Sequence, residues 1–150
     1  MRVQEAYNHW SATYDSDENR TRDLDQAVTH QTLVGSRCNS ILEIGCGTGK
    51  NTLLLTGIGE RVLALDISEG MLKKAKAKLD SDNLIFSAAD ITRQWPCADR
   101  STDLVVCNLV LEHIEDLPFI FSEVVRCLVD GGRFFICELH PFRQYQGTQA

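Results

Sequence analysis

A short apolar segment, a glycine-rich loop and a second apolar segment follow one another at residues 41–55, and this order constrains the fold more than any other feature. Residues 41–44 have the pattern of a buried strand, and a helix is expected directly after the loop. Between them, Gly45, Gly47 and Gly49 permit backbone angles that other residues avoid, so a ligand can approach the main chain. The helix start offers free N–H groups and a partial positive charge. Strand, loop and helix in this order are typical of a nucleotide site in a doubly wound α/β fold.

The spacing of the three glycines separates two classes of nucleotide site. A dinucleotide fingerprint reads G-x-G-x-x-G, whereas this loop reads G-x-G-x-G, and it lacks the Gly-Lys-Ser/Thr of a phosphate loop. The block E-I-G-C-G-T-G at residues 43–49 resembles the first motif of the class I, Rossmann-like S-adenosylmethionine-dependent methyltransferases. The resemblance implies S-adenosylmethionine as the cofactor. The alternative is a glycine-rich turn that binds no ligand. The residues that the resemblance places at the cofactor are Glu43, Gly45, Cys46, Gly47 and Gly49.

An acidic residue ends the second expected strand, at residues 61–66. Asp66 lies about 20 residues after the loop begins, where a carboxylate binds the ribose hydroxyls in nucleotide folds. The alternative for Asp66 is a helix N-cap, but Ser68 can cap the next helix and would leave Asp66 free. By resemblance to the second family motif, Ile67 and Met71 are also cofactor residues, although core packing explains Met71 equally well.

Two further strands are expected to end at the same edge of the sheet. Residues 83–88 form one, and the Asp90-Ile91 pair that follows resembles the third family motif, in which the acid and the next backbone N–H bind adenine. The alternative for Asp90 is a turn residue. Residues 103–108 form the other strand, and the resemblance places the backbone carbonyl of Asn108 at the methionine amino group. The acids Glu43, Asp66 and Asp90 together suit a cationic sulfonium.

Aromatic residues and a histidine are the candidates for the acceptor side of the site. Tyr7, Trp10 and Tyr14 fall on one helix face and resemble the aromatic N-terminal segment that closes over the cofactor in small-molecule methyltransferases. A face simply packed on the domain is the alternative. His113 ends an N-x-x-L-E-H segment typical of such enzymes, and it is the candidate catalytic residue. It could take a proton from the acceptor, or it could pack at the start of the next helix.

The alternation of strands and helices predicts a doubly wound, mostly parallel sheet of order 3-2-1-4-5. Residues 1–150 are expected to form a single domain with a helical cap over residues 1–35. The fifth strand, at residues 133–139, is apolar and uncharged in its centre, and the last two strands of the family fold are missing, so we expect a shortened form or a homodimer through the open edge. The segment at residues 140–145 resembles the start of an acceptor-side segment. A helix beginning near Pro118 is expected to face the core with Ile120, Phe121, Val124, Val125 and Leu128.

Composition and charge exclude several classes of function. The net charge of −6 disfavours a nucleic-acid partner, and no apolar run approaches the roughly 20 residues of a membrane span. The six cysteines include no C-x-x-C pair, so we expect buried, reduced thiols in a cytoplasmic protein and no metal site.

The residues therefore predict methyl transfer from S-adenosylmethionine to a small-molecule acceptor by direct displacement. A cofactor-binding module without full catalytic activity is the second interpretation. A dinucleotide-dependent oxidoreductase is the third, and both the glycine spacing and the Asp90 motif argue against it.

Overall fold

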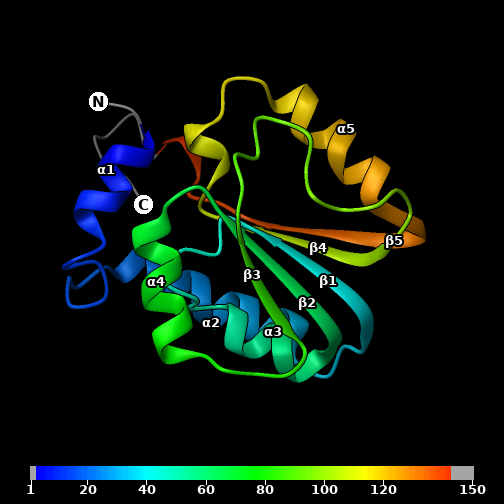
Figure 1. Cartoon of the computed structure of the whole chain (residues 1–150), viewed down its shortest axis with the longest axis horizontal. Coiled ribbons are helices and arrows are strands. Elements are labelled where there is room, and N and C mark those ends of the chain that lie inside the picture. The colour runs from blue at the N-terminus through cyan, green and yellow to red at the C-terminus, as the bar shows by residue number, and fades with distance from the viewer. Residues whose placement is uncertain (1–2, 143–150) are drawn as a thin grey trace.

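A five-stranded parallel sheet of order β3-β2-β1-β4-β5 forms the centre of the computed structural model, which describes residues 3–142 (Figure 1). The predicted strand order is confirmed. The strands are β1 (Cys38–Ile44), β2 (Gly59–Asp66), β3 (Leu84–Ala88), β4 (Thr102–Asn108) and β5 (Leu128–Cys137). The helices are α1 (Val3–Trp10), α2 (Arg20–Leu33), α3 (Thr52–Ile58), α4 (Glu69–Lys78), α5 (Leu117–Cys127) and the 3-10 helix η1 (Leu111–His113).

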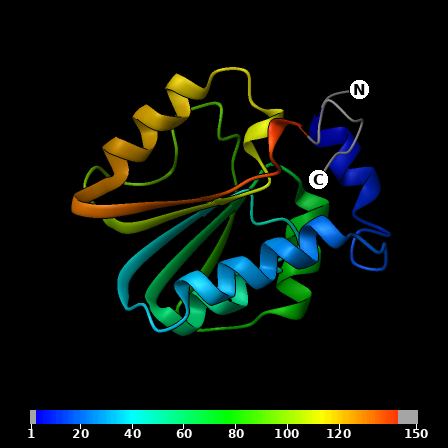
Figure 2. The same ribbon diagram turned by 180° about the vertical axis from the view of Figure 1, so that it is seen from behind.

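Helices cover both faces of the sheet, with α5 on one face and α2, α3 and α4 on the other (Figures 1 and 2). Alternate residues of each strand supply the two cores. Leu42 of β1 packs in the core beneath α5, whereas its neighbour Ile41 packs in the core with Leu55 of α3. Strands covered on both faces read as continuous apolar runs, which is why β1 and β4 were recognisable in the sequence.

Side-chain caps begin three of the helices. Ser68 accepts a hydrogen bond from the N–H of Met71, as predicted for α4. Asp116 caps α5, and Pro118 lies in the first turn of that helix, where its missing N–H has no cost. Asn19 caps α2, because its side chain accepts a hydrogen bond from the N–H of Arg22. Among residues 3–142, no helix is long and apolar enough to span a membrane.

The inward face of α5 differs from the predicted one. Ile120 and Val124 are buried as expected, but Phe121 is 42% and Val125 74% exposed. Glu123 takes their place in the interior, because its carboxylate accepts a hydrogen bond from the Trp95 N–H at 2.8 Å. The residue at 128 is no longer helical, since β5 begins there.

The edge strand β5 is longer than predicted. It begins at Leu128 instead of Arg133 and therefore includes Gly131 and Gly132, and its pairing with β4 is irregular between Thr102 and Leu104. Residues 143–145 of the expected acceptor-side segment lie outside the described part of the chain.

Candidate active site

A cavity of about 350 Å³ lies at the carboxyl ends of the strands, a size within the usual range of ligand sites. Parallel strands end at one edge, so residues far apart in the sequence meet there. Gly49 is not among the lining residues; a side chain at its position would meet Leu79 of the neighbouring segment at 2.8 Å, so Gly49 serves packing. The predicted site residues that line the cavity are Glu43, Gly45, Cys46, Gly47, Asp66, Ile67, Met71, Asp90, Ile91, Asn108 and His113.

The glycine loop forms the floor of the cavity. Gly45 and Gly47 have φ values of +72° and +54°, which other residues rarely adopt. A Cβ atom at Gly45 would lie 2.2 Å from Val110, whereas one at Gly47 would meet no atom within 4 Å. Gly45 therefore permits close packing within the protein, and Gly47 keeps the backbone open toward the cavity.

Asp66 holds the glycine loop in place. Its Oδ2 accepts a hydrogen bond from the Gly47 N–H and its Oδ1 accepts one from the Ser68 N–H, both at 2.8 Å. The expectation that capping by Ser68 leaves Asp66 free is therefore wrong, because the carboxylate is bound to two backbone groups. Each carboxylate oxygen of Asp66 has a further lone pair, so both oxygens can still accept hydrogen bonds from ribose hydroxyls. Burial raises the pKa of Asp66.

Glu43 lies beneath the loop and is almost fully buried. Its Oε2 accepts a hydrogen bond from the Thr52 hydroxyl at 2.6 Å. Burial raises the pKa of Glu43 to about 8, so the side chain is mostly neutral at pH 7.

Asp90 forms a turn, which was the alternative interpretation, and it also lies at the cavity where the adenine role was expected. Its Oδ1 accepts hydrogen bonds from the N–H and the hydroxyl of Thr92, which is an Asx turn, and the residue also borders the cavity. Ile91 is buried beside it, and its carbonyl accepts a hydrogen bond from the Trp95 indole. Met71 likewise serves both interpretations, since it is fully buried and lines the cavity.

A buried polar cluster on α2 completes one wall, and sequence reasoning missed it. Asp25 accepts hydrogen bonds from the side-chain amides of Asn108, at 2.6 Å, and Asn51, at 2.9 Å. Thr29, one helical turn later, accepts a second bond from Asn108. The Oδ1 atoms of Asn51 and Asn108 are buried and find no partner in the described chain. The sequence feature that could have revealed this cluster is the polar pair Asp25 and Thr29, spaced i, i+4 in a helix that packs on the sheet.

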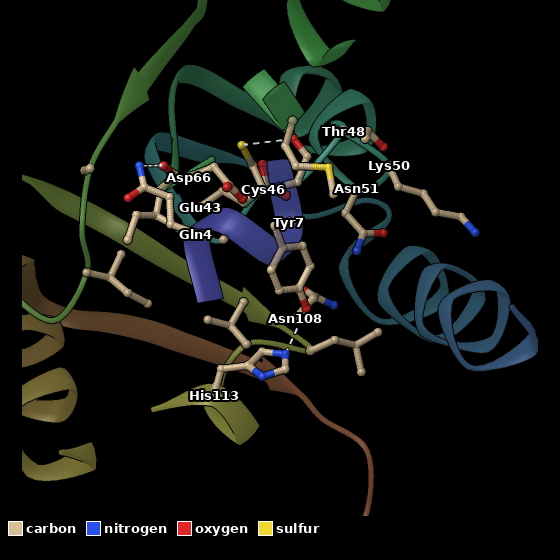
Figure 3. Close-up of a pocket in the computed structure, with 18 of the residues that line it drawn as sticks. Gln4, Tyr7, Glu43, Cys46, Thr48, Lys50, Asn51, Asp66, Asn108 and His113 are labelled. Atoms are coloured by element: carbon tan, nitrogen blue, oxygen red, sulfur yellow. Dashed lines mark hydrogen bonds between the residues drawn. The ribbon is translucent and has the colours of Figure 1, made fainter. Parts of the chain in front are cut away.

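Tyr7 and Tyr14 of the aromatic N-terminal segment line the cavity, and Figure 3 shows Tyr7 pointing toward His113. The Tyr7 hydroxyl lies 2.8 Å from Nε2 of His113, and the two rings meet edge to face. Burial raises the pKa of Tyr7, which keeps the hydroxyl protonated. Helix α1 is anchored beside the cavity because Gln4 donates to the Ile67 carbonyl at 3.0 Å. The segment therefore both packs on the domain and borders the cavity.

Glu138 supports the segment that carries His113. Its Oε1 accepts hydrogen bonds from the N–H groups of Val110 and Leu111, each at 3.0 Å. The two bonded residues come directly after Leu109 in the sequence, and Leu109 has the unusual φ of +56°. Burial raises the pKa of Glu138. The sequence signal was an acid at the end of the last apolar strand, in the same position as the acids after the other strands.

This fold and this cavity define a class of protein: a doubly wound α/β domain with a nucleotide-type site at the switch point of its sheet. Residues 42–136 match the family model described as a methyltransferase domain. The chain is 32% identical to a malonyl-[acyl-carrier protein] O-methyltransferase of Hahella chejuensis, over 99% of this chain and 53% of that protein. It is 34% identical to a demethylmenaquinone methyltransferase of Lactococcus lactis, over 93% of this chain and 60% of that protein.

Solved structures agree with these sequence relatives. A DhpI–SAM–HEP complex superposes with a TM-score of 0.77 at 28% identity, over 95% of this chain and 68% of that one. A putative methyltransferase from Haloferax volcanii, solved with the Trm112 activator, shares the fold with a TM-score of 0.76 at 24% identity, over 87% of this chain and 58% of that one.

The chain belongs to the class I S-adenosylmethionine-dependent methyltransferases, and S-adenosylmethionine is the cofactor of this family. The predicted resemblance is confirmed. The chain spans about half the length of the first of these curated relatives.

Proposed function

We propose that this chain binds S-adenosylmethionine in the cavity at the strand ends and transfers its methyl group to a small-molecule acceptor. The observation that carries the proposal is the joining of the glycine loop, Asp66 and the Asp25–Asn51–Asn108 cluster in one cavity. The Asp25 carboxylate within this cluster suits an ammonium group. The donor set thus fits the cofactor of the family.

Each part of the cofactor has a candidate partner in this proposal. Asp66 accepts from the two ribose hydroxyls, while Asp90 and the N–H of Ile91 bind adenine. Asn108 meets the methionyl amino group, and Asn51 joins it there as a residue that the family motif did not indicate. When bound, the cofactor supplies an activated methyl group.

The chain contributes positioning and proton handling at the mouth of the cavity. Direct displacement needs a nucleophile held close, in line and away from water, and such positioning supplies roughly 7–11 kcal/mol in favourable cases. His113 is the candidate base, but the Tyr7 hydroxyl is hydrogen-bonded to its Nε2. An acceptor hydroxyl or amine therefore has to replace the Tyr7 hydroxyl at Nε2 before His113 can take its proton.

A cofactor-binding module without turnover is the second candidate function. The chain covers 53% of the first relative and 60% of the demethylmenaquinone enzyme. In this reading the described chain holds the cofactor, and further residues or a second subunit complete the acceptor site.

Calorimetric titration with S-adenosylmethionine, S-adenosylhomocysteine and NAD tests the binding step. Binding of the first two and not of NAD supports the proposal, whereas binding of NAD alone would revive the oxidoreductase interpretation. A methyl-transfer assay with demethylmenaquinone and malonyl-thioester acceptors then separates an enzyme from a module. Tight cofactor binding without transfer to any acceptor would favour the module.

The proposal extends to assembly and location. Strand β5 is an edge of the described sheet and Ile136 on it is 42% exposed, which supports pairing with a second copy. Light scattering over a dilution series tests this, and a monomer at every concentration contradicts it. The six free cysteines support a cytoplasmic location, since reducing compartments preserve free thiols.

A further inference from the structure

Two cysteines meet at the edge of the sheet opposite the cavity, in a cluster that the proposed function does not use. Cys97 lies in the loop before β4, and Cys127 is the last residue of α5. Backbone hydrogen bonds bring these segments together, because the Ser101 N–H donates to the Cys127 carbonyl at 2.9 Å. The Arg126 guanidinium donates to the Cys97 carbonyl at 2.6 Å. Cys127 belongs to the core cluster beneath α5, and Cys97 packs against the same cluster.

Two hydroxyl groups lie close to the Cys97 sulfur. Its Sγ lies 3.3 Å from the Ser101 hydroxyl and 3.4 Å from the Thr102 hydroxyl. Cys97 is half-buried, so small reagents can reach it, whereas Cys127 is fully buried behind it. The prediction of uniformly buried thiols is wrong at this position.

The two thiols differ strongly in acidity. The neighbouring Cys127 thiol, together with both hydroxyls and the Arg126 charge, lowers the pKa of Cys97 to about 5. Cys97 in turn, together with burial, raises the pKa of Cys127. A thiolate beside a neutral thiol is the arrangement that oxidative disulfide formation requires, because the thiolate is the nucleophile.

We propose that Cys97 and Cys127 form an oxidisable dithiol site that hydroperoxides convert to an intramolecular disulfide. In the first step, the Cys97 thiolate attacks the outer peroxide oxygen, the O–O bond breaks, and the leaving oxygen takes a proton to become an alcohol or water. Cys97 becomes a sulfenic acid. In the second step, the Cys127 sulfur gives up its proton and attacks the Cys97 sulfur, and the S–O bond breaks to release water. The thiol pair loses two electrons and the peroxide gains two.

Two consequences separate this site from ordinary cysteine oxidation. Cys137 is also half-buried, but burial raises its pKa to about 12, so it serves as the matched control thiol. At neutral pH we expect Cys97 to react at least about tenfold faster than Cys137, because its thiolate fraction is far larger. The disulfide joins the loop before β4 to the end of α5 without involving any residue that lines the cavity.

The test treats the full chain with hydrogen peroxide at pH 7 and maps its peptides by mass spectrometry without reduction. The expected result is a Cys97–Cys127 link that dithiothreitol reverses and that Cys97→Ser abolishes. In Cys127→Ser, Cys97 should accumulate as a sulfenic acid that dimedone traps. Overturning results are peroxide treatment of the parent protein that leaves Cys97 unlinked, or oxidation of Cys137 at the same rate. Mapping of the parent decides the question even if the buried variant fails to fold.

Discussion

Replacement of Asp66 by alanine should weaken both cofactor binding and folding, and the structure separates the two effects. If the ribose assignment is right, loss of hydrogen bonds from the ribose to a carboxylate costs about 1.5–3 kcal/mol, which is a Kd about 10- to 150-fold higher. The variant also deprives the Gly47 and Ser68 N–H groups of their acceptor. At about 1 kcal/mol for each lost bond, the free energy of unfolding should fall by about 2 kcal/mol. Calorimetric titration measures the first quantity and urea unfolding of the ligand-free protein measures the second.

Asp103 provides a matched control for this experiment. Its carboxylate likewise accepts two backbone hydrogen bonds, from Asn39 at 2.8 Å and Ser40 at 2.6 Å, but it begins β4 and is absent from the cavity wall. Asp103→Ala should therefore lower the free energy of unfolding by a similar amount and leave the Kd unchanged. An unchanged Kd in Asp66→Ala would refute the ribose assignment, and an unchanged unfolding energy would refute the role of Asp66 in holding the loop.

Three further predictions concern the loop, its buried acid and the support of the histidine segment. Gly47→Val should abolish cofactor binding in a titration, because the φ of +54° at Gly47 excludes a branched residue. Cys46→Ser should bind the cofactor with a Kd within about threefold of the parent value, since the loop acts through its backbone. Equal binding by both variants would contradict this account of the loop. In Glu43 the pKa is raised from 4.5 to about 8, so its stabilising contribution is complete below pH 4.5 and is lost as the pH rises through 8. Glu43→Gln should accordingly be more stable than the parent near pH 9 in urea unfolding, with the difference shrinking toward pH 5. Glu138→Ala should lower the free energy of unfolding by about 2 kcal/mol through two lost backbone bonds and reduce any methyl transfer more than cofactor affinity; a parallel loss of both would argue for a purely structural role.

The order of strands and the location of the site could be predicted because they depend on local patterns. Residues such as Ile44 and Val105 lie in apolar runs that only a doubly covered parallel strand explains. Once the strands are parallel, the acids that follow them, Asp66 and Asp90, must meet at one edge of the sheet. The prediction therefore needed no knowledge of individual contacts.

The functions of single side chains were harder to predict, because they depend on helix rotation and on partners far away in the chain. On α5, a bond from Trp95 turns Glu123 inward and leaves Val125 exposed, although apolar periodicity alone favoured Val125. Hydrophobic patterning ranks residues by type, whereas a buried hydrogen bond can reverse that ranking.

The sequence by itself determined the glycine loop, the parallel order of the strands and the family of this protein, since each follows from local spacing. Only the tertiary structure decided which polar groups meet. The Asp25–Asn108 bond joins residues 83 positions apart, and the Tyr7–His113 bond joins residues 106 positions apart. No local pattern encodes such pairs, because the packing of α1 and α2 against the sheet sets which side chains face the cavity and how far apart their atoms lie.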